Sequence, residues 1–222
     1  MKNPWLDLPR TKPYVLEIDR PHVEAFNRHA STKHRLDLRM LPLPFVGNRQ
    51  APLLVLGLNP SYQPDSRRLD RDGTARGDAI RANLGPKPRG HVHPGLNPEF
   101  AETSGGRWWR RCFRALIDKG HTADSLARDV LAVEFHGYRS LNWQPIPYTL
   151  PSQHFGFELV RRAMQRQATI VLARGRRHWD VAIPELRNYD SRVELKNARS
   201  ATISPKNCTR RGFALVRKAL EG

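Results

Sequence analysis

Short apolar segments alternate with stretches of helical spacing along this chain, and this alternation constrains the fold more than any other feature. The first segment, 51–58 (APLLVLGL), is apolar throughout and is typical of a strand buried on both faces. Further strands are predicted at 129–136, 169–173 and 192–196. Strands separated by helices favour an α/β fold, here a three-layer α/β/α domain with a central four-stranded parallel sheet.

Apolar residues at helical spacing, polar N-caps and closing glycines predict the helices of this fold. The predicted helices cover 22–31, 104–120, 151–167, 178–186 and 209–220. Residues 1–50 are expected to form an N-terminal arm whose helix packs on the core, and 51–222 the main domain. Inside that domain, 61–103 is a polar insert rich in Gly, Pro and Arg, and its lack of periodicity predicts either a functional surface or partial disorder.

The length and the two cysteines restrict the class of protein. A chain of 222 residues is enough for one domain with a sizeable core, and we expect a monomer. No apolar run approaches the roughly 18 residues of a membrane-spanning helix, and the N-terminus lacks the apolar centre of a signal peptide. We therefore expect a cytoplasmic protein with no membrane partner. Cys112 and Cys208 form no CxxC pattern, which predicts no metal site.

The charge indicates the partner. The chain carries 38 Lys and Arg against 21 Asp and Glu, a formal net charge of +17. Arg outnumbers Lys by 30 to 8. Guanidinium groups bind phosphate bidentately and stack on flat rings, so this bias favours a nucleic acid. The alternative is an Arg-rich composition inherited from a GC-rich genome, which accounts for part of the excess.

The loops that follow the strands are the expected place for a ligand, because ligands of parallel α/β sheets bind beyond the carboxyl ends of the strands. The first of these loops is GLNPS, from Gly57 to Ser61. Its glycine permits close backbone approach, and Asn59 is placed to orient a water or to hydrogen-bond a ligand. Taken alone, the pentapeptide favours a turn that only ends a strand.

Two further motifs accompany GLNPS. The chain contains SGGRWW at 104–109 and TISPKN at 202–207. In this order and spacing the three motifs resemble those of the uracil-DNA glycosylase superfamily. They are closest to the single-strand-selective monofunctional branch (GMNPG, SGxRFW, HPSPRN), with the mismatch-specific branch next. The resemblance covers about 51–220 and implies a uracil-DNA-glycosylase-like domain that excises a base from DNA without a metal or redox cofactor.

The resemblance implies roles for the two outer motifs. Asn59 matches the catalytic Asn or Asp that positions the attacking water, and Thr202 stands where the family often has a catalytic His. The rest of the last motif matches the loop that enters the minor groove. The residues expected to contact DNA are Ser204, Pro205, Lys206, Asn207, Arg174, Arg176 and Arg107. For the basic residues among them, a solvated surface is the alternative.

The same resemblance assigns a base-binding set and exposes two departures from the family pattern. The expected base-binding residues are Gly57, Leu58, Ser61, Tyr62, Gln63, His136, Gly137 and Tyr138. His136–Tyr138 (HGY) stands where the family has HNL, so the uracil-recognising Asn is missing. Ser61 replaces a Tyr that excludes groups on pyrimidine C5 in the most uracil-specific branch. Both changes favour a modified or C5-substituted pyrimidine over plain uracil.

The sequence therefore predicts a monofunctional DNA glycosylase. Lys206 is the only lysine in the expected motifs, and it is poorly placed for a Schiff base. Defence against phage with modified DNA extends this hypothesis. The alternatives are a non-catalytic nucleic-acid-binding protein with a degenerate glycosylase fold, and a plain uracil or mismatch repair glycosylase.

Overall fold

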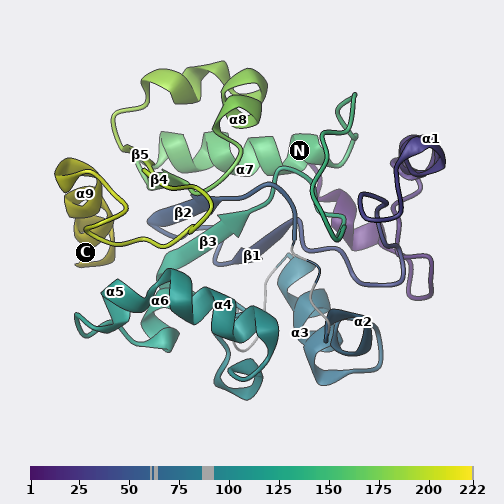
Figure 1. Cartoon of the computed structure of the whole chain (residues 1–222), viewed down its shortest axis with the longest axis horizontal. Helices are drawn as coiled ribbons and strands as arrows, with labels where there is room; N and C mark the ends of the chain where they lie inside the picture. The colour runs from purple at the N-terminus through teal and green to yellow at the C-terminus, as the bar shows by residue number, and fades with distance from the viewer. Residues whose placement is uncertain (61, 63–64, 87–92, 222) are drawn as a thin grey trace.

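The computed structural model describes residues 1–60, 62, 65–86 and 93–221. Ser61 and Gln63, both expected to contact the base, lie outside the described residues. Figure 1 shows a central sheet with helices on both sides. No helix among the described residues is long and apolar enough to cross a membrane.

The sheet has five strands, and only four of them are parallel. They are β1 (Phe45–Gly47), β2 (Leu53–Leu56), β3 (Val130–Val133), β4 (Thr169–Leu172) and β5 (Arg192–Glu194). The spatial order is β1-β3-β2-β4-β5, with β2 to β5 parallel and β1 antiparallel to β3. The prediction of a four-stranded parallel sheet is therefore wrong by one antiparallel edge strand.

β1 was not predicted from the sequence, and the reason is physical. It is three residues long, it follows the proline-punctuated stretch around Pro42 and Pro44, and it carries no period that local pattern could reveal. Its place in the sheet comes from pairing with a distant segment, since Phe45 stands opposite Val133. Residues 1–50 thus contribute a strand to the sheet in addition to the expected helix.

The helices largely follow the predicted pattern, with additions. They are α1 (Arg20–His29), α2 (Ser66–Leu69), α3 (Ala75–Leu84), α4 (Ser104–Cys112), α5 (Arg114–Ile117), α6 (Ala123–Asp129), α7 (Gln153–Gln165), α8 (Arg176–Ala182) and α9 (Arg210–Glu221). Short 3-10 turns occupy Pro4–Asp7, Pro98–Phe100 and Pro184–Asn188. The predicted helix 104–120 is broken at Phe113, and the insert 61–103 contains α2 and α3.

Alternate residues of the strands face two different cores. Leu54 and Leu56 of β2 join one buried cluster with side chains from α1, α7 and α8. Leu53 and Val55 of the same strand join a second cluster with side chains from α4, α6 and α9. This alternation follows from the two-residue period of a strand, and it gives the three layers seen in Figure 1.

The N-terminal residues belong to the first of these cores. Trp5 and Val15 are buried in the same cluster as the β2 leucines. The ring of Trp5 lies 5.7 Å from that of Tyr138, centroid to centroid. Residues 1–50 therefore pack into the same core as the β2 leucines.

Candidate active site

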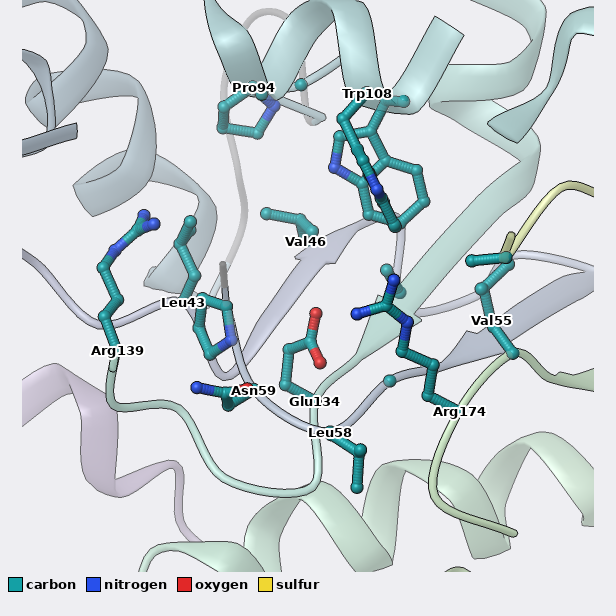
Figure 2. A pocket seen from close by; sticks show the side chains of 18 of the residues that line it. Leu43, Val46, Val55, Leu58, Asn59, Pro94, Trp108, Glu134, Arg139 and Arg174 are labelled. Carbon is teal, nitrogen blue, oxygen red and sulfur yellow. The ribbon is translucent and has the colours of Figure 1, made fainter. Parts of the chain in front are cut away.

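A cavity opens at the carboxyl ends of β2, β3 and β4, where the alternation of strands and helices predicted a ligand site. Each of these strand ends contributes a polar lining residue: Asn59 follows β2, Glu134 follows β3 and Arg174 follows β4 (Figure 2). Its apolar walls are formed by Leu43, Val46, Val55, Pro94, Trp108, Trp109 and Ala132. A largely apolar cavity with a few polar groups is the usual form of a site for a small flat ligand.

The turn after β2 is fixed by hydrogen bonds with β3, with the segment that follows β3 and with α8. The Gly57 amide donates to the Val133 carbonyl at 2.9 Å, and the buried Trp179 indole donates to the Gly57 carbonyl at 2.9 Å. The His136 amide donates to the Leu58 carbonyl at 3.1 Å. The predicted base-binding residues Gly57 and Leu58 both line the cavity, and this network holds their backbone in place.

Asn59 is oriented by a short chain of hydrogen bonds. Its Nδ2 donates to Ser140 Oγ at 3.0 Å, and Ser140 Oγ in turn donates to the Asn142 carbonyl at 2.8 Å. Ser140, the residue in the middle of this chain, is buried. With Nδ2 engaged, Oδ1 remains as a hydrogen-bond acceptor on a residue that lines the cavity. The predicted catalytic Asn is therefore in the cavity with its amide anchored.

Glu134 was not predicted, and it places a carboxyl group in the cavity beside Asn59 (Figure 2). Its Oε2 is buried and has no hydrogen-bond partner among the described residues. Burial raises the pKa of Glu134 to about 7, although the positive charges of Arg174 and Arg139 act in the opposite direction. A β-carbon at Gly57 would lie 2.1 Å from Oε2, so glycine at this position makes room for the carboxyl group.

A buried ion-pair cluster closes another side of the cavity. Asp70 pairs with Arg139, Nη2 to Oδ2 at 2.7 Å, and with the Nε of Arg76. Arg139 Nε also donates to the Leu41 carbonyl at 3.1 Å. Both arginines line the cavity, and both are less than a tenth exposed. Two cations thus share the carboxylate of Asp70, and the carboxyl groups of Glu134 and Asp65 also act on Arg139.

The helix α4, which carries the SGGRWW motif, supplies an aromatic wall. Trp108 and Trp109 both line the cavity, with ring centroids 4.7 Å apart and planes nearly perpendicular. Trp109 also stacks on Phe113 at 5.6 Å, which anchors it to the core below. Trp108 is only partly buried and is the flat surface available to a ligand.

The loop after β5 reaches the cavity through Ala201, which has a left-handed backbone (φ +50°). The neighbouring Thr202 is not a lining residue, and its hydroxyl lies 2.9 Å from Ser200 Oγ. Asn207 is buried and shapes the loop: its Nδ2 donates to the Thr202 carbonyl at 2.9 Å, and its Oδ1 accepts from the Asn197 amide at 2.7 Å. Asn207 thus holds the loop from inside.

The other predicted DNA contacts are at the surface. Pro205 and Lys206 are exposed at the turn before α9, and Ser204 is partly buried. Arg174 is exposed and lines the cavity. Arg176 is ion-paired, with Nη1 2.7 Å from Glu194 Oε2.

Arg107 lies on the exposed side of α4, 3.9 Å from Glu102. Around the same loops, several exposed cations make no ion pair with any described residue. They are Arg174, Arg177, Lys196, Arg199 and Lys206. The side of the sheet that holds the cavity is therefore bordered by free positive charge.

The HGY segment lies away from the cavity, contrary to expectation. The Tyr138 hydroxyl donates to Asp19 Oδ2 at 2.7 Å in the core, and Gly137 packs against Trp5. His136 is buried, and burial lowers its pKa to about 4. These three residues do not line the cavity because the chain turns into the core after Glu134.

Tyr62 also lies elsewhere than expected. Its ring stacks under the guanidinium of Arg67 at 5.0 Å, beside Leu141 and outside the lining of the cavity. The cavity instead contains Glu134, two positions before His136. One signal for Glu134 was available, since an acidic residue directly after four buried strand residues must lie at the carboxyl edge of the sheet. No local signal pointed to Arg76, which lies in the insert.

Comparisons of the chain with protein-family models, with curated proteins and with solved structures find no match. Among the described residues, no group of three or more His, Cys, Asp or Glu side chains is arranged to hold a metal ion.

Proposed function

We propose that this protein is a monofunctional DNA glycosylase that turns a modified or C5-substituted pyrimidine out of DNA and hydrolyses its N-glycosidic bond. The observation that carries the proposal is the anchored amide of Asn59 in a cavity at the carboxyl ends of three parallel strands. The order of the three motifs, which resembles that of the uracil-DNA glycosylase superfamily, supports the same function.

In the proposed reaction, Asn59 Oδ1 accepts a hydrogen bond from a water molecule and orients its oxygen toward C1′ of the sugar. The bond from C1′ to the base nitrogen breaks, the water oxygen bonds to C1′, and one water proton is lost to solvent while the base leaves with the bonding electrons. The products are an abasic site and the free base. Asn59 is suited to orientation rather than to proton abstraction, because an amide is a very weak base.

DNA binding is supported by the cations beside the cavity. Arg174, Arg177 and Lys206 are exposed and make no ion pair with the described residues. They are placed to bind phosphates on either side of the extruded nucleotide, while the base stacks on Trp108. The preference for a C5-substituted pyrimidine rests on the resemblance, in which Ser61 replaces a Tyr that excludes C5 groups. Because such pyrimidines are typical of viral genomes, we extend the proposal to defence against phage with modified DNA.

Base release tests this function. DNA duplexes and single strands carrying uracil, mismatched thymine, 5-hydroxymethylcytosine or glucosylated cytosine are incubated with the protein. Release is measured by mass spectrometry of the free base and by alkali-labile strand cleavage. We expect release of one or more modified pyrimidines, reduced about 100-fold or more in Asn59→Ala.

Asn188→Ala is the matched control, since Asn188 is exposed and outside the cavity. It should release base at the rate of the unmodified protein. Salt-sensitive DNA binding without release of any base would instead identify a non-catalytic DNA-binding protein. Efficient release of uracil alone would identify a plain repair glycosylase, and either result would overturn the proposal.

A further inference from the structure

Glu134 brings an unused hydrogen-bond acceptor into the cavity. Its Oε2 is shielded from solvent and has no hydrogen-bond partner among the described residues. Two fully buried carboxylates elsewhere are engaged, since Asp70 pairs with two arginines and Asp19 accepts two hydrogen bonds. A buried acceptor without a partner is unfavourable, and because Glu134 lines the cavity, a ligand that donates a hydrogen bond to its carboxyl group would offset this cost.

The position of this carboxyl group is fixed. The Glu134 amide donates to the Pro44 carbonyl at 2.9 Å, which holds the end of β3 against the segment before β1. Gly57 lies directly against the carboxyl group, and Asn59 lies beside it (Figure 2). A pyrimidine whose sugar reaches Asn59 and whose ring stacks on Trp108 would therefore turn its hydrogen-bonding edge toward Glu134.

The chemistry of a carboxylate discriminates between the two kinds of pyrimidine. An ionised carboxylate accepts hydrogen bonds and cannot donate them. Cytosine and its derivatives present an amino donor at position 4, whereas uracil and thymine present a carbonyl acceptor there. Resting on the proposed function, we propose that Glu134 recognises the 4-amino group and directs the enzyme to C5-substituted cytosines over the uracils with the same substituent.

The protonation state of Glu134 makes the expected base preference depend on pH. The charges that face it are Arg174 and Arg139, and Arg139 is itself paired with Asp70 beside Arg76. With a pKa of about 7, the group is ionised at pH 8, and at position 4 of the base it can then pair with an amino group but not with a carbonyl group. At pH 6 it is largely protonated, so it both donates and accepts and fits either base. The preference for cytosines is therefore expected to rise with pH.

Matched base pairs test the inference. Release is measured from DNA carrying 5-methylcytosine or thymine, and 5-hydroxymethylcytosine or 5-hydroxymethyluracil, at pH 8 and pH 6. The bases of each pair share the C5 group and differ at the Watson–Crick edge. At pH 8 the cytosine-to-uracil rate ratio should be about tenfold or more higher in the unmodified protein than in Glu134→Gln, whose amide can donate. At pH 6 this difference should shrink.

The second measurement is equilibrium binding of the same DNAs to Asn59→Ala, with and without Glu134→Gln, which detects base selection when cleavage is absent. Glu24→Gln, an exposed substitution on α1, is the control for loss of a negative charge. Thermal unfolding verifies that each variant is folded. We expect tighter binding of the cytosine members in Asn59→Ala and loss of this preference in the double variant.

The outcomes separate the two proposals. Base release with the same ratio in the unmodified protein and in Glu134→Gln would overturn the role of Glu134 and leave the glycosylase function standing. An equal loss of release from both members would also overturn it, and would assign Glu134 to proton transfer. If no base is released and binding shows no preference, both proposals fail.

Discussion

Two carboxyl groups, one in the core and one in the cavity, show how this molecule treats buried charge differently in different regions. Asp19 is fully buried, with Oδ1 accepting from the Ser152 amide at 3.0 Å and Oδ2 accepting from the Tyr138 hydroxyl at 2.7 Å. Glu134 has a buried Oε2 with no hydrogen-bond partner among the described residues. One carboxyl group is satisfied by the chain, and the other is open to a ligand.

The comparison distinguishes a buried carboxyl group with a structural role, Asp19, from one that lines the candidate site, Glu134. Asp19 ties the N-terminal arm to the segments after β3 and before α7, so its partners belong to the fold. Glu134 faces a cavity, and its unsatisfied oxygen makes the free protein less stable than the fold alone requires. Sites commonly hold groups in unfavourable surroundings that a ligand relieves.

The largest expected effect on stability comes from removing Asp19, the carboxyl group whose two oxygens both accept hydrogen bonds. Asp19→Ala leaves the Tyr138 hydroxyl and the Ser152 amide buried without an acceptor, so we expect a loss of about 3 kcal/mol in the free energy of unfolding. Denaturant unfolding measures it. Asp7→Ala, at an exposed ion pair, should change stability by less than about 0.5 kcal/mol. Equal effects of the two variants would contradict the structural role of Asp19.

The second prediction concerns a substitution at Glu134 that increases stability. The pKa of Glu134 is raised in the folded state, so the folded protein retains a proton that the unfolded chain releases, and stability falls as pH rises from about 4.5 to about 7. Glu134→Gln removes this loss. We expect the variant to be more stable by about 2 kcal/mol at pH 8, and by much less near pH 5.

Unfolding curves of both proteins across this pH range measure the difference. The lowered pKa of His136 acts in the other direction, since stability is lost as pH falls from about 6.5 to about 4. This contribution is common to both proteins and cancels in their difference. A stability difference that does not vary with pH would show that Glu134 is not held in an unfavourable setting.

The smallest expected effect on stability concerns the charges that border the cavity. Arg174→Ala removes an exposed guanidinium, so unfolding should change by less than about 0.5 kcal/mol. DNA affinity should fall for every sequence, and the slope of log K against log salt should decrease by about 1, as one phosphate contact is lost. Arg28→Ala, exposed on α1, should leave the slope unchanged. An unchanged slope in Arg174→Ala would remove this residue from the proposed DNA interface.

Much of the fold follows from local pattern. The segments at β2 and β4 can be recognised in the sequence because parallel strands that are buried on both faces are apolar throughout. The segments at α7 and α9 carry the apolar spacing of helices that pack on one side. The same reasoning places Asn59 at the carboxyl edge of the sheet, where the structure has it. These features depend on the residues next to one another in the chain.

The placement of the remaining site residues depends on distant contacts. Glu134 and Tyr138 are four positions apart, yet Glu134 lines the cavity and Tyr138 lies in the core. The reason is that Tyr138 hydrogen-bonds Asp19, which lies 119 positions away in the sequence. Arg76, within the insert, and Arg139, after β3, meet at Asp70. No periodicity or motif encodes such meetings.

The sequence by itself determined the four parallel strands, the motif turn with Asn59 and the strongly basic surface, since each follows from composition or short-range spacing. Only the tertiary structure decided that β1 joins the sheet, that Glu134 lies in the cavity and that HGY does not. The physical reason is that strand pairing and the burial of polar groups are satisfied by partners far away in the chain, and those partners are chosen only when the chain folds.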